Sequence, residues 1–550
     1  MFRLAARVSR QLRVWGRRHL SRTAIPKRVP RVMAATTLVG TIAVAIALSQ
    51  PYQLDAKPKG RGVPVEELQK HNSKENGVWV AINGDVYDLT DFLEMHPGGE
   101  KIILKYAGTN ALKIFNKYHA KDVFAKFLSP EAYIGPLVGE LEEAADITEG
   151  EMDPERLNKL ENLPLIHHMM NLSDFEAVAR QIIPPNAWAY YLSAADDEMS
   201  NRENHYAFHR IFFNPKVLVD VRDVDISTDM LGTKVAAPFY CLAAAQARLG
   251  HPDGELGISR GCGKERIIQM ISSVALYSFD EIMDSALPDQ THWFQLYVLP
   301  DRQLAYDAIE RANRRGAKAL FVTVDAPELG NREKDRKFRL NLDLDDNSDE
   351  DAAIAAQMDA DVVMSHKDAG LTWKDIADFK KIAKMPVVLK GVQRVEDVLL
   401  AVENGVDAVV LSNHGGRQLD FARAPIEVLA DVMPILRERK LDDKIEVYID
   451  GGVTRGTDVL KALCLGAKGV GLGRAFLFAN SCYGEKGVQK MIKLLKEEIR
   501  LNMKLLGVSK ISELTPELVD TRSLIARSAQ PDYMYNTSYE PLTPPKFRDE

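Results

Sequence analysis

The sequence predicts a multidomain chain, with a small α+β domain over residues 63–140 followed by an α/β (β/α)8 barrel over residues 171–520. Composition is the first indication, because 46% hydrophobic and 27% charged residues among 550 are typical of a soluble globular protein with two or three domains. A polar and aromatic segment with strand character around residue 80, in which Asn83-Gly84-Asp85 predicts a hairpin turn, indicates the first domain. Apolar β-branched runs that alternate with helix-length segments after residue 170 indicate the second.

Residues 1–56 have the pattern of a targeting sequence. Residues 1–31 are rich in arginine and lack acidic residues, as mitochondrial presequences do. Apolar residues recur there on one helical face: Leu4, Val8, Leu12 and Trp15. The next seventeen residues, 32–48, are uncharged, slightly fewer than the roughly 20 that a spanning helix needs. This arrangement predicts a cleaved bipartite presequence and delivery to the mitochondrial intermembrane space; a retained single anchor is the alternative.

Charge is distributed unevenly along the chain. The formal net charge is -7, but residues 1–54 contain nine Arg, one Lys and no acidic residue, which leaves 61 basic against 78 acidic residues, or -17. An acidic body argues against nucleic acid and suits a basic protein partner, because opposite fields speed encounter. Plain solubility explains the charge equally well. The cysteines form no C-x-x-C pair and are expected to be buried thiols without a chemical role: Cys241, Cys262, Cys464 and Cys482.

Two histidines in the first domain predict a haem site. His96 precedes Pro97-Gly98-Gly99, which favours extended backbone at the histidine and a tight turn beyond it. His119 follows a helical stretch and is expected to face His96 across a crevice. One histidine alone would more often be a capping or surface residue, but two imidazoles fill both axial positions of an iron and leave it to electron transfer. The crevice walls are expected to be apolar: Phe92, Leu93, Ile103, Phe115 and Phe124.

The H-P-G-G motif, the downstream histidine and the closing Tyr133-Ile-Gly-Pro-Leu resemble the cytochrome b5 family over about 75 residues. This resemblance implies a b-type haem (haem b) with His96 and His119 as its axial ligands. Residues 141–170 are acidic and lack a strong apolar period, so they predict a solvated hinge and a mobile haem domain.

Eight short apolar runs predict a (β/α)8, or TIM, barrel. The predicted strands are residues 238–242, 267–271, 293–298, 319–324, 387–390, 408–412, 446–450 and 469–471. A doubly wound sheet is the alternative, but the chain lacks the Gly-rich turn that such a sheet needs after its first strand. Functional residues of a barrel gather where its strands end at their carboxyl side. From the third strand on, those ends carry Gln295, Tyr297, Thr323, Asp325, Lys390, His414, Arg417, Asp450, Gly473 and Arg474.

Any one of these residues is more simply a structural hydrogen-bonding group, but the series together indicates an active site. His414 and Arg417 place a base beside a guanidinium fork that holds a carboxylate, as dehydrogenation of a 2-hydroxy acid requires. Asp325 is expected to orient the imidazole and raise its basicity. Lys390 would offset the negative charge of a reduced flavin, and the glycine-rich segments after the last two strands would bind its phosphate.

The motifs S-N-H-G-G-R-Q, D-G-G-V with R-G-T-D, Q-L-Y and T-V-D-A-P together resemble the FMN-dependent 2-hydroxy acid dehydrogenase and oxidase family, over about 350 residues. The resemblance implies a catalytic set of His414, Asp325, Tyr297, Lys390 and Arg417. It implies that the substrate is bound by Tyr190, Tyr297, Arg332, His414 and Arg417. The implied FMN contacts are Ala243, Ala244, Ala245, Ser272, Gln295, Thr323, Lys390, Asp450, Gly451, Gly452, Val453, Thr454, Gly473 and Arg474.

Three positions depart from the family pattern. Thr454 stands where an arginine is usual, so one phosphate contact is expected to be lost or taken over by Arg455. Ala244 replaces a common threonine in the first flavin strand. Val274 occupies a pocket position that varies with the substrate, which leaves the side chain of the hydroxy acid open.

The two resemblances together imply an enzyme that oxidises (S)-lactate, or L-lactate, to pyruvate on FMN. Electrons would then pass singly to the haem and on to cytochrome c. The alternatives are mandelate or another L-2-hydroxy acid as substrate, oxygen as acceptor, and a nonenzymatic electron carrier with a degenerate barrel, which the complete catalytic set opposes. Residues 341–361 are predicted to be a flexible acidic excursion. The tail over 521–550 is irregular, and family tails that wrap neighbouring subunits imply a homotetramer.

Overall fold

The computed structural model describes residues 61–96, 100–120, 123–124, 128–144, 154–337 and 368–527. The predicted presequence, the acidic excursion and residues 528–550 of the tail lie outside the described residues, as do residues 145–153 of the hinge. Helix α6 (Pro154–Glu161) forms within the predicted hinge, and none of its residues is buried. Across the described ranges, no helix is both long and apolar enough to cross a membrane.

The amino-terminal domain is built on a five-stranded sheet in the order β1-β5-β4-β3-β2. Its strands are β1 (Val63–Pro64), β2 (Asn72–Ser73), β3 (Gly77–Ile82), β4 (Asp85–Asp88) and β5 (Tyr133–Val138). The predicted hairpin joins β3 to β4, where Asn83 (φ 53°) and Gly84 (φ 79°) both adopt the left-handed backbone that a type I′ turn requires. The prediction of a hairpin at this turn is therefore confirmed.

Alternation along β3 divides the core of this domain between the two faces of the sheet. Val78, Val80 and Ile82 pack with helices α3 (Glu100–Lys105) and α4 (Leu112–Tyr118). Trp79 and Ala81 point the other way and pack beside α2 (Val65–Leu68). Because successive side chains of a strand point to opposite faces, this one strand supports both cores, and the α3–α4 side carries the two histidines.

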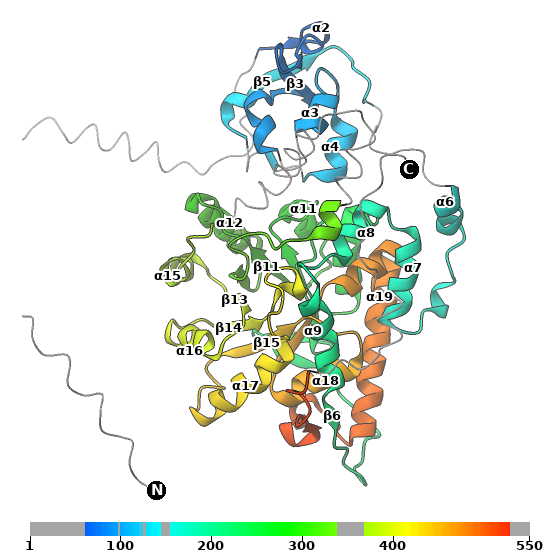
Figure 1. Cartoon of the computed structure of the whole chain (residues 1–550), viewed down its shortest axis with the longest axis vertical. Helices are drawn as coiled ribbons and strands as arrows, with labels where there is room; N and C mark the ends of the chain where they lie inside the picture. Colours follow the sequence, from blue (N-terminus) through cyan, green and yellow to red (C-terminus); the bar gives the residue numbers. More distant parts are fainter. Residues whose placement is uncertain are drawn as a thin grey trace, which may run out of the picture. The chain divides into compact units, whose positions relative to one another are not determined.

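The second domain is a closed barrel of eight parallel strands, as predicted (Figure 1). In barrel order the strands are β9 (Phe239–Cys241), β10 (Gln269–Ser272), β11 (His292–Leu296), β12 (Leu320–Thr323), β13 (Val387–Val392), β14 (Ala408–Leu411), β15 (Glu446–Asp450) and β16 (Gly469–Leu472). Strand β16 pairs with β9 and closes the ring. Each strand overlaps one of the eight predicted runs, which confirms the barrel and excludes the doubly wound alternative.

Helices surround these strands (Figure 1). They are α10 (Gly254–Lys264), α11 (Phe279–Asp284), α12 (Arg302–Arg315), α15 (Trp373–Ile382), α16 (Val395–Glu403), α17 (Pro425–Glu438), α18 (Gly456–Leu465) and α19 (Arg474–Leu506). Inward-facing side chains fill the barrel with aromatic rings, including Tyr240, Trp293, Phe321 and Tyr448. Alternate strand residues such as Phe239 and Phe294 pack outward against the helices. The barrel is therefore a filled core, and ligand space is left at its ends.

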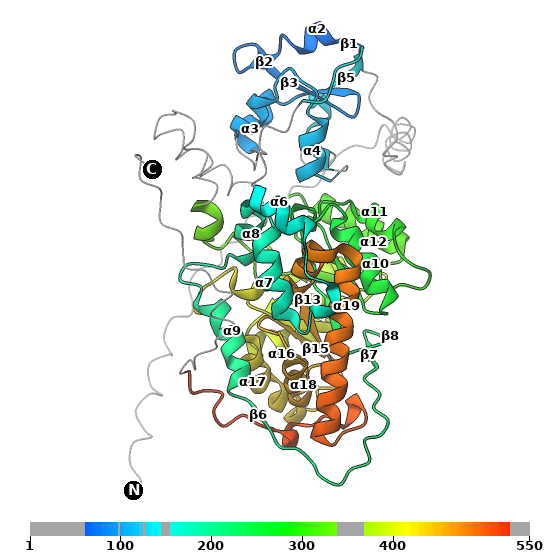
Figure 2. The ribbon, with the colours of Figure 1, turned by 90° about the vertical axis from the view of Figure 1, so that its right-hand side faces the viewer.

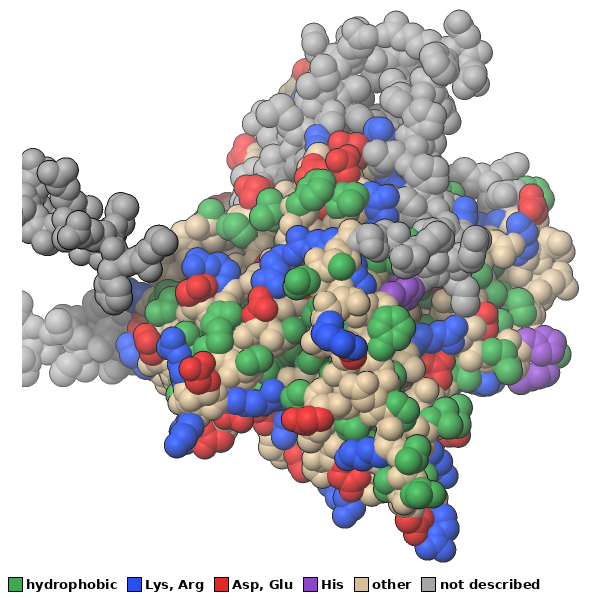
Figure 3. All heavy atoms as spheres, turned by 60° about the horizontal axis from the view of Figure 1, so that its bottom comes forward, with side chains coloured by type: hydrophobic (Ala, Val, Ile, Leu, Met, Phe, Trp, Pro, Cys, Tyr) green, Lys and Arg blue, Asp and Glu red, His purple; other side chains and the backbone are tan. Residues whose placement is uncertain are grey.

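Three helices precede the barrel: α7 (Leu172–Ile182), α8 (Pro185–Leu192) and α9 (Met199–His209). Helix α7 packs along α19 (Figure 2). The hairpin of β7 (Thr228–Met230) and β8 (Thr233–Val235) places Met230 and Val235 in the barrel core. Figure 3 shows basic and acidic side chains interspersed over one face of the molecule.

The first residues of the predicted tail are held against the barrel domain. Strand β17 (Val519–Asp520), which directly precedes the tail, pairs with the short strand β6 (Phe212–Phe213). Arg527 Nη2 then donates to Glu427 Oε2 at 2.8 Å, and Arg210 Nε donates to the Leu524 carbonyl at 3.0 Å. Residues 521–527 form no helix or strand, as expected of an irregular tail.

Candidate active site

A cavity of about 260 Å³ opens where the barrel strands end at their carboxyl side. All fourteen residues expected to contact FMN line it, from Ala243 to Arg474. All five residues expected to bind the substrate line it too: Tyr190, Tyr297, Arg332, His414 and Arg417. Residues drawn from strands β9 to β16 meet there because a closed parallel barrel brings its carboxyl ends to one mouth.

His414 is held at this cavity by a hydrogen bond at each ring nitrogen. It follows β14 with a left-handed backbone (φ 58°), and its Nδ1 lies 2.9 Å from Asp325 Oδ1. An ionised carboxylate only accepts, so Nδ1 carries the hydrogen and Nε2 keeps its lone pair. The Tyr297 hydroxyl lies 3.2 Å from Nε2. The base nitrogen therefore faces the cavity residue that is expected to contact the substrate hydroxyl.

Burial sets the protonation of His414. It lowers the pKa of the imidazole, Asp325 raises it and Lys390 lowers it, so that the pKa falls to about 4. Asp325 raises the pKa of His414, as the sequence predicted, but burial lowers this pKa by more. The imidazole is consequently neutral, and able to accept a proton, at neutral pH.

We expect a matching pH profile. Because the pKa of His414 is lowered from 6.5 to about 4, the acid limb of kcat/KM should lie below pH 6.5 and approach pH 4. Asp325→Asn removes the influence that raises this pKa, so the limb should move to still lower pH while kcat decreases. Profiles of both proteins over pH 4–8 test this, and an acid limb that moves upward in the variant would contradict it.

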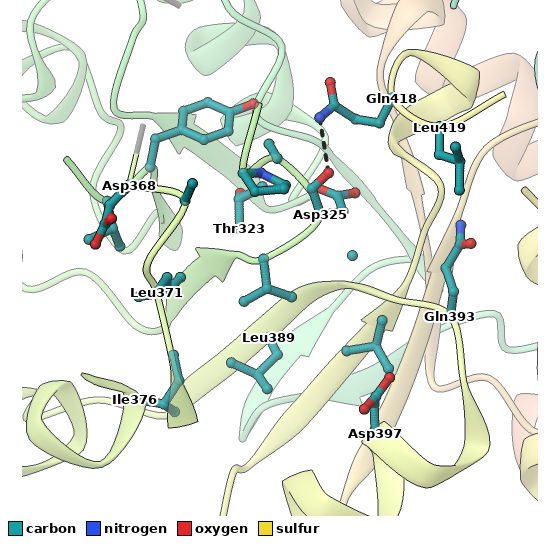
Figure 4. A pocket seen from close by; sticks show the side chains of 18 of the residues that line it. Thr323, Asp325, Asp368, Leu371, Ile376, Leu389, Gln393, Asp397, Gln418 and Leu419 are labelled. Carbon is teal, nitrogen blue, oxygen red and sulfur yellow. Dashed lines mark hydrogen bonds between the residues drawn. The ribbon is translucent and has the colours of Figure 1, made fainter. Parts of the chain in front are cut away.

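Asp325 lies behind His414 and does not line the flavin cavity itself. It borders a second cavity of about 410 Å³, together with Leu389 and Gln393 (Figure 4). Gln418 Nε2 donates to the Asp325 backbone carbonyl at 3.0 Å and so fixes this segment. Gly391 (φ 113°) makes room for the carboxylate, because a Cβ atom there would lie 2.4 Å from Asp325 Cγ.

Lys390 is fixed in a buried network at the ends of β13 to β15. Its Nζ lies 3.7 Å from Asp450 Oδ2 and 3.5 Å from Ser412 Oγ, and Ser412 Oγ donates to Asp450 Oδ1 at 2.6 Å. Burial lowers the pKa of Lys390, but Asp325 and Asp450 outweigh it, and the pKa is raised. The ammonium therefore stays charged inside the cavity, where a reduced flavin gains negative charge.

Two guanidinium groups create a site for an anion. Arg417 Nη1 donates to the carbonyls of Tyr190 and Ser193, both at 2.7 Å, and the guanidinium lies 4.9 Å from the Tyr190 ring centroid. Arg332 is 5% exposed, and its Nε donates to the Arg417 carbonyl at 3.4 Å. Burial, and then Arg417, lower the pKa of Arg332 to about 9. A bound carboxylate would relieve this repulsion between two buried cations.

The rest of the cavity fits a flavin nucleotide. Ser272 Oγ donates to Gln295 Oε1 at 3.1 Å, and Gln295 Nε2 donates to Thr323 Oγ1 at 2.9 Å, which gives a fixed polar edge. Gly451 (φ 88°) and Gly452 (φ 78°) form a left-handed turn that presents backbone N–H groups to a phosphate. Arg474 lies beside them at the start of α19.

The structure separates the two outcomes expected at Thr454. Thr454 lines the cavity, whereas Arg455 does not, and Arg455 Nη1 donates instead to Glu498 Oε1 at 3.1 Å. In this arrangement Arg455 does not replace the arginine that the family usually has.

Several polar residues at or behind the cavity were not predicted from the sequence. Ser412 and Asn413 belong to the S-N-H-G-G-R-Q motif, which offered a signal for them. Helix α9 offered none, although it buries a row of polar residues: Ser200, Asn201, Asn204 and His205. Two of these, Asn201 and His205, line the cavity, and Glu176 of α7 does so as well.

The two histidines of the amino-terminal domain face each other. Their ring centroids are 5.9 Å apart, with an interplanar angle of 64°. Burial, and then His96, lower the pKa of His119 to about 3, so its ring is neutral and able to coordinate iron. The expected wall residues all belong to this one apolar cluster: Phe92, Leu93, Ile103, Phe115 and Phe124. Two imidazoles that lie together beside apolar walls fit a haem with two histidine ligands.

Comparisons with known proteins identify a family for each of the two domains. The chain matches the FMN-dependent dehydrogenase family over residues 179–521 and the cytochrome b5-like haem/steroid binding domain over residues 64–138. It is 55% identical over 523 residues to L-lactate dehydrogenase (cytochrome) of Wickerhamomyces anomalus, which covers 92% of this chain and 91% of that protein. Identity to L-lactate dehydrogenase (cytochrome) of Saccharomyces cerevisiae is 49% over 540 residues, or 95% and 90% of the two chains.

A solved structure gives the same likeness. A mutant flavocytochrome b2 with pyruvate bound is 53% identical, covers 73% of this chain and 100% of its own, and superposes with a TM-score of 0.64.

Proposed function

The chain belongs to the family of FMN-dependent dehydrogenases, here with a cytochrome b5-like domain before the barrel, and from this premise we propose that it oxidises L-lactate to pyruvate. It is an oxidoreductase that uses FMN in the barrel and haem b in the amino-terminal domain. The observation that carries the proposal is the coexistence of a neutral base beside two buried guanidinium groups with a separate facing pair of histidines.

The predicted catalytic and substrate-binding residues each have a role in this reaction. Arg417, Arg332 and Tyr190 hold the substrate carboxylate, because buried cations favour an anion at this point. Tyr297 bonds the substrate hydroxyl, and His414 Nε2 accepts a proton from the substrate while Asp325 holds the resulting imidazolium in place. Lys390 offsets negative charge at the flavin.

The fourteen residues expected to contact FMN would hold it in this cavity, where it would supply a two-electron acceptor for the substrate, by hydride or carbanion, and a one-electron donor to a haem. His96 and His119 would hold the haem iron through their imidazoles. A haem held by two histidines would supply one-electron transfer rather than oxygen binding.

We infer that cytochrome c is the final acceptor. The support is the net charge of -17 outside residues 1–54, which attracts a basic protein. The rate of cytochrome c reduction should therefore fall as salt rises. A rate that is unchanged by salt would count against this partner.

Two further proposals concern assembly and location. The chain forms a homotetramer, for which the support is the resemblance to a family whose tails wrap neighbouring subunits. Light scattering of the purified protein measures its mass, and a monomer would overturn this proposal. The bipartite pattern of residues 1–56 supports the mitochondrial intermembrane space, which fractionation of mitochondria tests.

Anaerobic stopped-flow mixing with L-lactate tests the proposed function. Flavin absorbance and haem absorbance are followed together, with D-lactate as the matched control. We expect flavin reduction first and haem reduction after it with L-lactate, and neither with D-lactate. Reduction by mandelate alone would move the substrate to the alternative hydroxy acid, and flavin reduction that oxygen reverses while the haem stays oxidised would favour an oxidase.

A further inference from the structure

Helix α9 carries a buried amide that pairs with the loop holding the base. Asn204 Nδ2 donates to Asn413 Oδ1 at 2.7 Å, and Asn413 Nδ2 donates to Asn204 Oδ1 at 2.6 Å. The two side chains are 1% and 3% exposed. Each amide supplies both a donor and an acceptor, so this reciprocal pair satisfies groups that would otherwise be buried without partners.

Asn413 in turn shapes the base loop, defined here as residues 412–417. Its Oδ1 also accepts from the Gly416 backbone N–H at 3.1 Å, and its Nδ2 donates to the Arg423 carbonyl at 3.1 Å. Three successive residues of this loop, His414 to Gly416, have left-handed backbones. Such a loop keeps its shape only where its surroundings hold it, and the Asn413 side chain bridges its two sides.

The same α9 residue also contacts the phosphate loop, defined here as residues 450–454. A Cβ atom at Gly452 would lie 2.0 Å from the Asn204 carbonyl oxygen, and one at Gly451 would lie 3.0 Å from Asn204 Nδ2. The phosphate loop is therefore packed directly on this residue. Neither Asn204 nor Asn413 is among the residues that line the flavin cavity.

We propose that Asn204 is a positioning residue that couples the phosphate loop to the base loop, so that FMN binding and the placement of His414 depend on one another. Only the expected effect on kcat rests on the proposed function; the expected effect on FMN binding does not. Asn204 joins the loops through a backbone contact on one side and a two-way amide pair on the other. Removing the Asn413 amide leaves the buried Asn204 amide without its partner. Removing the Asn204 amide leaves Asn413 with only its bonds to Gly416 and Arg423, so either change loosens both loops together.

Four variants test the coupling: Asn204→Ala, Asn204→Ser, Asn413→Ala and the double alanine variant. The matched control is Asn313→Ala, since Asn313 also makes two hydrogen bonds through its amide, to the Ile382 carbonyl and from the Lys384 N–H, but on helix α12. FMN dissociation is measured by the fluorescence of released FMN, and thermal midpoints are recorded for every variant. Asn204→Ser retains a hydroxyl and serves if the alanine variants fold poorly.

Both alanine single variants should release FMN about tenfold more readily and lower kcat about tenfold, and the double variant should be no worse than either one. Asn313→Ala should lower only the thermal midpoint. FMN release is measured without substrate or turnover. Weaker FMN binding in Asn413→Ala would therefore support the coupling even if the proposed function were wrong. The proposal would be overturned if Asn204→Ala or Asn413→Ala released FMN as wild type does. It would also be overturned by additive effects in the double variant, or by an equal increase of FMN release in Asn313→Ala.

Discussion

Replacing His414 by glutamine should lower kcat for L-lactate by about 10²–10⁴-fold, because general-base catalysis contributes a factor of this size. Glutamine fills a similar space and still reaches towards Asp325 and Tyr297, but it cannot accept a proton at neutral pH. The variant should therefore keep its FMN, its haem and its affinity for pyruvate. The measurement is the rate of flavin reduction in anaerobic stopped flow, with flavin and haem content determined from the absorbance spectrum.

His292→Gln is the matched control for this variant. His292 is also buried and neutral, since burial lowers its pKa to about 4, and it bonds Ser259 Oγ at 3.0 Å at the start of β11, away from the cavity. Its replacement should affect thermal stability and leave flavin reduction close to wild type. Equal rate losses in the two variants would mean that a buried histidine is needed for folding alone, and the assignment of His414 as the base would fail.

The strand pattern accounts for how much of this site could be predicted from the sequence. Runs such as 387–390 and 446–450 are apolar because parallel strands of a barrel are buried on both sides. A polar residue that ends such a run has to lie at the carboxyl end of its strand, where all eight ends meet. Lys390 and Asp450 could thus be placed in one cavity although 60 residues separate them in the chain.

Burial depth could not be predicted in the same way. The sequence indicates that Asp325 and His414 pair, and they do so at 2.9 Å. It does not indicate how completely the imidazole is removed from water, and this removal outweighs the carboxylate and lowers the pKa to about 4. A hydrogen-bond partner such as Asp325, which follows a predicted strand, can be inferred from the sequence. The desolvation of His414 depends on every element packed around its ring.

The supports behind the cavity show a second limit. Asn204 and Asn413 are 209 residues apart, and an asparagine within a polar helix such as α9 is ordinarily solvent-exposed. No local period distinguishes a buried amide pair from surface residues. The irregular register of β13 between Lys390 and Val392 is similarly invisible, although Gly391 stands at this irregularity and makes room for Asp325.

Replacing His119 by alanine should abolish electron transfer to cytochrome c while leaving the oxidation of lactate intact. Removal of one of the two proposed histidine ligands should leave the haem poorly held, and we expect haem loss and at least about a 100-fold decrease in the reduction of cytochrome c, the proposed acceptor. Flavin reduction by L-lactate should stay within about twofold of wild type, because His119 belongs to a separate domain and lines no part of the flavin cavity. Both rates come from one stopped-flow comparison, with ferricyanide as a small acceptor that needs no haem.

His71→Gln is the control within the same domain. The His71 ring stacks on the Trp79 ring, with their centroids 3.6 Å apart, and it is not one of the two proposed haem ligands. The haem content of this variant should therefore remain full. If His119→Ala kept its haem and reduced cytochrome c at the wild-type rate, the electrons would reach the acceptor by another route, and the axial pair would have no part in it. If flavin reduction fell together with cytochrome c reduction, the haem domain would be needed for the chemistry at the barrel as well as for transfer. The two readouts therefore separate a haem that carries electrons from a domain that supports the dehydrogenase.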